Sequence, residues 1–159
     1  MRVSEISPFQ ESTRRLATWA YALVRLLEFE GAWVALVPCA AFKICLGINM
    51  GILGRELERV RVRLGELLHD GVPVDHTGGL ERKVFSVAAS LKDEREIAAF
   101  LVAFHEDLLA SARRYLSTGF LVADEPTFDL AKGILLGLEP QLASLRSFSR
   151  GRFELDTHL

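Results

Sequence analysis

The sequence predicts an all-α protein built as an antiparallel four-helix bundle. Apolar residues recur every three or four positions along four long segments, which is the spacing of one helix face. No convincing segment alternates between apolar and polar residues, and the 159-residue chain shows no internal repeat. We expect a single domain over residues 1–159, with loose ends at residues 1–9 and 149–159.

The first two helices follow from their apolar stripes. The first is predicted from Glu11 to Val37, with Ser12 or Thr13 as its cap, and it ends at Pro38 because proline cannot donate a backbone hydrogen bond. Its inward stripe comprises Leu16, Ala20, Leu23, Leu27, Val34 and Val37. The second is predicted from Ala40 to Leu68, with an inward stripe of Leu46, Leu53, Val60, Leu64 and Leu67.

The second half of the chain predicts two more long helices. After a glycine-rich loop, a short extra helix is expected in the central connection, within residues 80–93. A long helix from Glu94 to Ser117 follows, and a last one, capped by Asp124 or Thr127, continues to about Phe148. The third long helix turns inward Ile97, Leu101, Leu108 and Ala112.

Composition excludes several classes of partner and location. The formal net charge is −2, and basic residues are spread out except around Arg61, so we expect no nucleic-acid partner. The longest uncharged stretch, Gly31 to Phe42, is too short to span a bilayer, and we expect no membrane association. Cys39 and Cys45 fit buried thiols of a cytoplasmic protein better than a disulfide framework or a zinc site.

Polar residues on the inward stripes are the candidates for chemistry. A carboxylate buried without a partner costs several kcal/mol, so such residues should pair with an imidazole, reach water or stay protonated. Each one alone is more often a hydrogen-bonded core group than a functional one. The candidate acid–base residues are His105, Glu56 and Glu30, and the candidate ligand-binding residues are Asn49, Gln141 and Glu139.

Two segments resemble those of bacterial ferritin-like proteins. Pro38, Lys43 and the pair Leu46-Gly47 occur in the order that such proteins show before their second metal-ligand helix. The run "ADEPT", residues 123–127, is similar to the entry into the last ligand helix of that family. The resemblance implies a ferritin-like bundle, in which carboxylates and two Glu-x-x-His pairs hold two metal ions.

The chain departs from the metal-binding pattern that the resemblance implies. Both Glu-x-x-His pairs are absent, and Glu56 and Gln141 stand where the capping imidazoles are expected. Pro140 also falls inside the last predicted helix, where a proline costs about 3 kcal/mol and kinks the backbone. We therefore expect no metal ion and no other cofactor.

The second predicted helix carries an unusual apolar and glycine-rich turn. Gly47, Gly51 and Gly54 each weaken a helix by roughly 1 kcal/mol relative to alanine, which indicates close approach of another backbone or room for a ligand. Because the turn is apolar on nearly every side, a protein partner could cover it, and ordinary packing in a thick bundle remains the alternative. The predicted partner interface comprises Phe42, Ile48, Met50 and Ile52.

Three functional hypotheses follow. The first is a metal-free ferritin-like accessory or partner subunit of a heteromeric enzyme complex, such as one of small-molecule biosynthesis, with another protein subunit, of the same or a different chain, as its partner. The alternative is a metal-independent enzyme in which either Glu30 or Glu56, together with His105, acts as general acid or base on a small molecule in the bundle cavity. A third hypothesis keeps a single-ion site formed by Glu30, Glu56 and His105, with or without Glu139.

Overall fold

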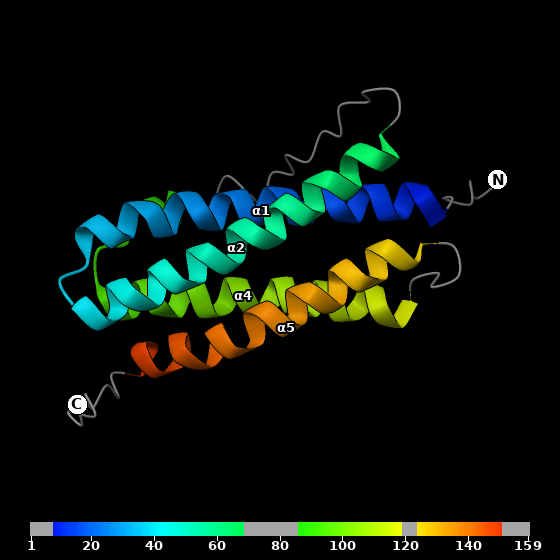
Figure 1. Ribbon diagram of the computed structural model, residues 1–159. Coiled ribbons are helices and arrows are strands. Elements are labelled where there is room, and N and C mark those ends of the chain that lie inside the picture. Colours follow the sequence, from blue (N-terminus) through cyan, green and yellow to red (C-terminus); the bar gives the residue numbers. More distant parts are fainter. Residues whose placement is uncertain (1–7, 69–85, 119–123, 151–159) are drawn as a thin grey trace, which may run out of the picture.

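All long elements in the part of the chain that the structure describes are helices. The computed structural model describes residues 8–68, 86–118 and 124–150, and these ranges contain no strand, which confirms the all-α prediction. The long helices are α1 (Pro8–Leu36), α2 (Ala40–Leu67), α4 (Glu94–Thr118) and α5 (Glu125–Ser149) (Figure 1). Of the predicted short helix, residues 86–90 are helical and residues 80–85 lie outside the described ranges. None of the described helices is long and apolar enough to cross a bilayer.

The four long helices form two hairpins that pack against each other. The turn at Pro38 joins α1 to α2, α4 and α5 form the second hairpin, and α2 packs against α5. Helices α2 and α4 run in the same direction, so the end of α2 and the start of α4 lie at opposite ends of the molecule (Figure 1). The Cys39 backbone N–H donates to Glu94 Oε1 at 2.7 Å, which ties the α1–α2 turn to the start of α4.

Aromatic side chains fill the core between the two hairpins. Trp19 of α1 meets Tyr115 of α4 edge to face with ring centroids 5.6 Å apart, and Phe42 of α2 lies 4.7 Å from Phe148 of α5. The buried stripe of α1 is rotated from the predicted one, because Ala20, Leu27 and Val34 are only half-buried. Its fully or nearly fully buried apolar residues are Leu16, Ala17, Trp19, Leu23, Leu26, Trp33 and Val37.

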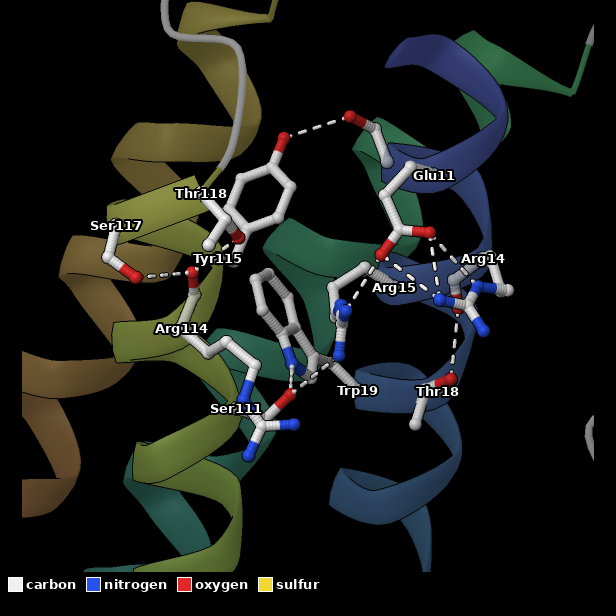
Figure 2. Close-up of polar contacts among 11 residues, drawn as sticks. Glu11, Arg14, Arg15, Thr18, Trp19, Ser111, Arg114, Tyr115, Ser117 and Thr118 are labelled. Carbon is white, nitrogen blue, oxygen red and sulfur yellow. Dashed lines mark hydrogen bonds and ion pairs between the residues drawn. The ribbon is translucent and has the colours of Figure 1, made fainter. Parts of the chain in front are cut away.

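Hydrogen bonds supplement this packing between α1 and α4. The Trp19 indole donates to Ser111 Oγ at 3.0 Å, and Arg15 reaches the same hydroxyl at 3.5 Å (Figure 2). Arg15 is itself held by Glu11 at 2.7 Å, one turn earlier on α1. Because a buried indole N–H needs an acceptor, Ser111 fixes the orientation of the Trp19 ring.

The predicted beginning of α1 is wrong. The helix starts at Pro8, where proline is favoured because its missing N–H would lack a helical partner anyway. Ser12 and Thr13 therefore lie inside α1 and do not cap it: the Thr13 hydroxyl donates to the Phe9 carbonyl at 2.8 Å. Residues 8 and 9 belong to this helix and Ser149 to α5, whereas residues 1–7 and 151–159 of the expected loose ends lie outside the described residues.

Of the two residues predicted to cap the last helix, Asp124 and Thr127, the structure shows Asp124 as the cap. Its carboxylate accepts a hydrogen bond from the Thr127 backbone N–H at 3.3 Å and pairs with Arg63 of α2 at 2.8 Å. Burial raises the pKa of Asp124, but hydrogen bonds from Ser12, Thr127 and Arg63 outweigh it and hold that pKa below its ordinary value. This one side chain therefore links the start of α5 to α1 and α2.

Replacing Asp124 with alanine is expected to destabilise the protein by roughly 2–3 kcal/mol, because the change removes a cap and leaves Arg63 without its buried partner. Urea unfolding of both proteins at pH 7 measures the difference. Since the folded pKa of Asp124 is low, its stabilisation is complete above the unfolded pKa and is lost as the pH falls through the folded value. Asp129→Ala is the control, because Asp129 forms only an exposed pair with Lys132. Equal effects of the two substitutions would contradict this role.

Candidate functional site

Three polar side chains meet in the middle of the core. Glu30 of α1, Asn49 of α2 and His105 of α4 are each fully buried, at 0% exposure. All three lie on stripes that the sequence predicted to face inward. The structure therefore brings together two of the candidate acid–base residues and one candidate ligand-binding residue, and we call this set the core cluster.

Asn49 is the bridge of the core cluster. Its side-chain amide donates a hydrogen bond to Glu30 Oε1 and lies 3.1 Å from His105 Nε2. The other ring nitrogen of His105, Nδ1, lies 2.8 Å from the Leu101 carbonyl oxygen, which can only accept. In a neutral ring Nδ1 must therefore carry the proton, and Nε2 accepts from Asn49.

Burial keeps both ionisable members of the core cluster neutral. Desolvation raises the pKa of Glu30 to about 8, although the hydrogen bond from Asn49 opposes the rise. Desolvation also lowers the pKa of His105 to about 4, against the opposing effect of the Leu101 carbonyl. At neutral pH the carboxyl group is therefore mainly protonated and the imidazole uncharged.

The two carboxyl oxygens of Glu30 differ in their contacts. Glu30 Oε1 accepts from Asn49, whereas Oε2 has no hydrogen-bond partner among the described residues. The carboxyl proton therefore belongs on Oε2. Nearby, burial with a smaller effect from Glu30 raises the pKa of Cys45 to about 11, so that thiol stays protonated and unreactive.

Glu56 does not join the core cluster. Although only 3% exposed, it faces α5 and pairs with Arg59 of its own helix at 2.9 Å, and it lies 3.7 Å from Arg55. Gly133 of α5 makes room for this ion pair, since a Cβ atom there would collide with the Arg59 guanidinium and lie 3.2 Å from Glu56 Oε2. Of the two acids predicted as alternatives beside His105, Glu30 therefore lies in the core cluster and Glu56 lies outside it.

The two remaining ligand-binding candidates are also apart from the core cluster. Glu139 lies on the surface of α5, where it pairs with Arg113 of α4 at 2.6 Å. Gln141 is half-buried on the same helix. Spacing along α5 placed both residues correctly on the helix, but Glu139 faces solvent and cannot line a cavity in the core.

The donor set does not fit the dimetal site that the ferritin resemblance implies. Among the residues that the structure describes, no three His, Cys, Asp or Glu side chains gather closely enough to hold a metal ion. Glu30 and His105 are separated by an amide that bonds to both, and Glu56 is committed to arginine. Glu139, the optional fourth ligand of the single-ion hypothesis, lies on the surface.

The predicted partner interface divides into buried and exposed residues. Phe42 is fully buried against Phe148, so its assignment to a contact surface is wrong. Met50 and Ile52 are half-buried, Met50 against Gly31 of α1 and Ile52 against Gly137 of α5. Ile48 is 54% exposed and, of the predicted four, is the one that can meet a partner.

Sequence reasoning missed a surface pocket between α2 and α5. The pocket has a volume of about 420 Å³ and is lined by the arginines Arg59 and Arg63 together with three acidic residues, Glu58, Glu66 and Asp129. Its mixed charge favours neither an anion nor a cation. The arginines were visible in the sequence, but nothing there showed that α5 would bring Asp129 beside them.

Comparison of the chain with protein-family models, curated proteins and solved structures finds no match. The site is therefore interpreted from its own geometry. A closed, neutral and hydrogen-bonded cluster has the properties of a structural element that joins three helices.

Replacing Glu30 with glutamine tests the neutral state of the core cluster. The raised folded pKa means that the carboxyl stabilises the fold fully below its unfolded pKa of about 4.3, and that this stability is lost as the pH rises toward 8. Glutamine mimics the protonated acid at every pH. The free energy of unfolding of Glu30→Gln relative to wild type should therefore rise between pH 5 and 8, by up to about 1.4 kcal/mol per pH unit.

Glu28→Gln is the matched control for this measurement. Glu28 lies on the same helix with a side chain 54% exposed, and it pairs with Arg25 at the surface. Urea unfolding at four pH values should show a pH-independent difference for this variant. A flat difference for Glu30→Gln as well would show that Glu30 is ionised in the folded protein.

Proposed function

We propose that this chain is a metal-free, ferritin-like four-helix bundle that acts as an accessory or partner subunit of a heteromeric enzyme complex. The observation that carries the proposal is the outward face of α2 formed by Ile44, Gly47, Ile48 and Gly51, which we call the α2 face. Ile44 is 64% exposed and Ile48 is 54% exposed, one helical turn apart. Paired aliphatic side chains on an exposed helix are a common element of protein interfaces.

The glycines of the α2 face support the same interpretation. A Cβ atom on Gly47 or Gly51 would meet no heavy atom within 4 Å, so neither glycine is needed for packing inside the chain. Each nevertheless weakens α2 by roughly 1 kcal/mol relative to alanine. Close approach of a helix from another protein would offset this cost by adding contacts that a side chain would block.

The course of the chain supports the ferritin-like assignment. Helices α1 and α5 run in one direction and α2 and α4 in the other, so the central connection must join opposite ends of the molecule (Figure 1). A single long crossover between two helical hairpins is the topology of ferritin-like bundles. The metal-free part of the proposal rests on the poor fit of the donor set.

An acid–base enzyme is the second candidate. The separated pKa values of Glu30 and His105 favour it, because a proton donor and an acceptor share one amide bridge. Both side chains are completely enclosed, however, and a substrate would need a path to them. The enclosed cluster and the exposed α2 face together support the subunit better than the enzyme.

Replacing Ile44 with aspartate tests the subunit proposal. A charge on the α2 face should weaken association with the partner by at least about tenfold, because the partner would have to bury an unpaired carboxylate. The measurement is the amount of a defined enzyme subunit that co-purifies with the tagged protein from its native cells. Leu136→Asp on α5 is the control, since Leu136 is an isolated apolar side chain with 76% exposure.

Wild type and Leu136→Asp should retain the same subunit near a one-to-one ratio, and Ile44→Asp should lose it. Equal retention by all three proteins would remove the α2 face from the interface. Absence of any stoichiometric partner from the wild-type preparation would overturn the accessory-subunit proposal itself.

A further inference from the structure

The outward surface of α2 carries a regular seam that extends well beyond the α2 face. Exposed residues recur with alternating spacings of four and three positions, which is the heptad pattern of helices that pair side by side. Over this span the seam is about 30 Å long at 1.5 Å per residue. Its members are Ile44, Ile48, Gly51, Arg55, Glu58, Val62 and Gly65.

The order of residues along the seam is self-complementary. We propose that the seam binds a second copy of this chain, with the two α2 helices antiparallel and a two-fold axis passing between residues 56 and 57. In this register Arg55 lies opposite Glu58 of the second copy, and Glu58 lies opposite the second copy's Arg55. A two-fold interface requires this reciprocity, because each contact must occur twice.

Shape complements charge in the same register. Val62, 56% exposed, lies opposite Gly51 of the second copy, and Ile48, 54% exposed, lies opposite its Gly65. A Cβ atom on Gly51 or Gly65 would meet nothing within 4 Å, so both glycines leave room for an approaching side chain. Two large aliphatic side chains of each copy therefore face two open backbone positions of the other.

A parallel pairing of the same helices lacks these features. It would set Arg55 against Arg55 and Glu58 against Glu58, and such like-charge contacts disfavour a complex. It would also place Val62 against Val62 and leave the glycines facing each other. The central charges therefore select direction and register, while the aliphatic residues on either side supply the buried surface.

Both charged residues of the seam are available for this contact. The Arg55 side chain is 64% exposed and lies 3.7 Å from Glu56 of the same chain. Glu58 is exposed on the same side of α2 and borders the surface pocket. Because both residues are exposed, they can pair across the two-fold axis without any rearrangement of α2 or of the buried core of either copy.

This inference rests on the proposed function in that both need the exposed side of α2 to be an interface. It names a second copy as the occupant of the span from Ile48 to Gly65, which leaves Ile44 and Gly47 of the α2 face for the enzyme subunit. Ile44 lies beyond the self-paired span, so Ile44→Asp tests the heteromeric contact and the charged pair tests the dimer.

Charge exchange provides the test. Sedimentation velocity of the wild-type protein at tens of micromolar and low salt should show a dimer. Arg55→Glu and Glu58→Arg should each weaken dimerisation by at least about tenfold, because each places like charges opposite one another. An equimolar mixture of these two variants should form a heterodimer, since every acidic residue of one chain then faces an arginine of the other.

The controls separate a loss of binding from a loss of folding. Lys132→Glu inverts a charge at an exposed position of α5 and should leave the dimer unchanged. Circular dichroism should give the same helix content for all variants, because each substitution lies on the surface. Re-formation of the dimer in the mixture is a gain that damaged protein could not produce.

Two outcomes would overturn the inference: a monomeric wild-type protein throughout this range, or a dimer that neither charge reversal weakens. If the wild type is monomeric while Ile44→Asp still loses the enzyme subunit, the dimer alone fails. If the charge-reversal variants behave as expected but no enzyme subunit depends on Ile44, the proposed function alone fails.

Discussion

Burial in the apolar core keeps the Glu30 carboxyl group and the His105 imidazole uncharged. The packing of three helices depends on the hydrogen bonds that hold these two groups. The side-chain amide of Asn49 provides these hydrogen bonds, because it donates to Glu30 on one side and to His105 on the other. The Leu101 carbonyl then holds the second ring nitrogen. Three helices are thereby tied together at one point, and each polar group is positioned by its neighbour.

This arrangement separates the polar interior from any function at the surface. Carboxylates that bind hard cations must be ionised, whereas Glu30 is held protonated by its surroundings. Glu56, the buried acid of α2, pairs with Arg59 at the boundary with α5. The features that remain for recognition lie outside, where α2 presents aliphatic residues, open glycines and a balanced pair of charges.

Spacing along the sequence predicted the long helices and the inward positions of Glu30, Asn49 and His105, because helix geometry repeats every 3.6 residues. The assignment of Phe42 to a contact surface was avoidable, because Phe42 lies four residues before Leu46 of the predicted inward stripe, whereas the exposed Ile48 lies off that stripe. Glu56 shared the stripe of Asn49, yet Arg59 three positions later was a local sign of a different environment. The environment of Glu56 depends on the packing of α2 against α5. This contact joins residues far apart in the sequence, so no local pattern could predict it.

The state of His105 tests this account most directly. Nitrogen-15 NMR of the imidazole between pH 5 and 8 should show an unchanging neutral ring with its proton on Nδ1, because burial keeps the pKa near 4 and the Leu101 carbonyl accepts that proton. A ring that titrates near the ordinary histidine value of about 6.5, or that carries its proton on Nε2, would contradict it. Either result would mean that the core cluster is open to water or differently bonded, and a catalytic role for Glu30 and His105 would again be favoured.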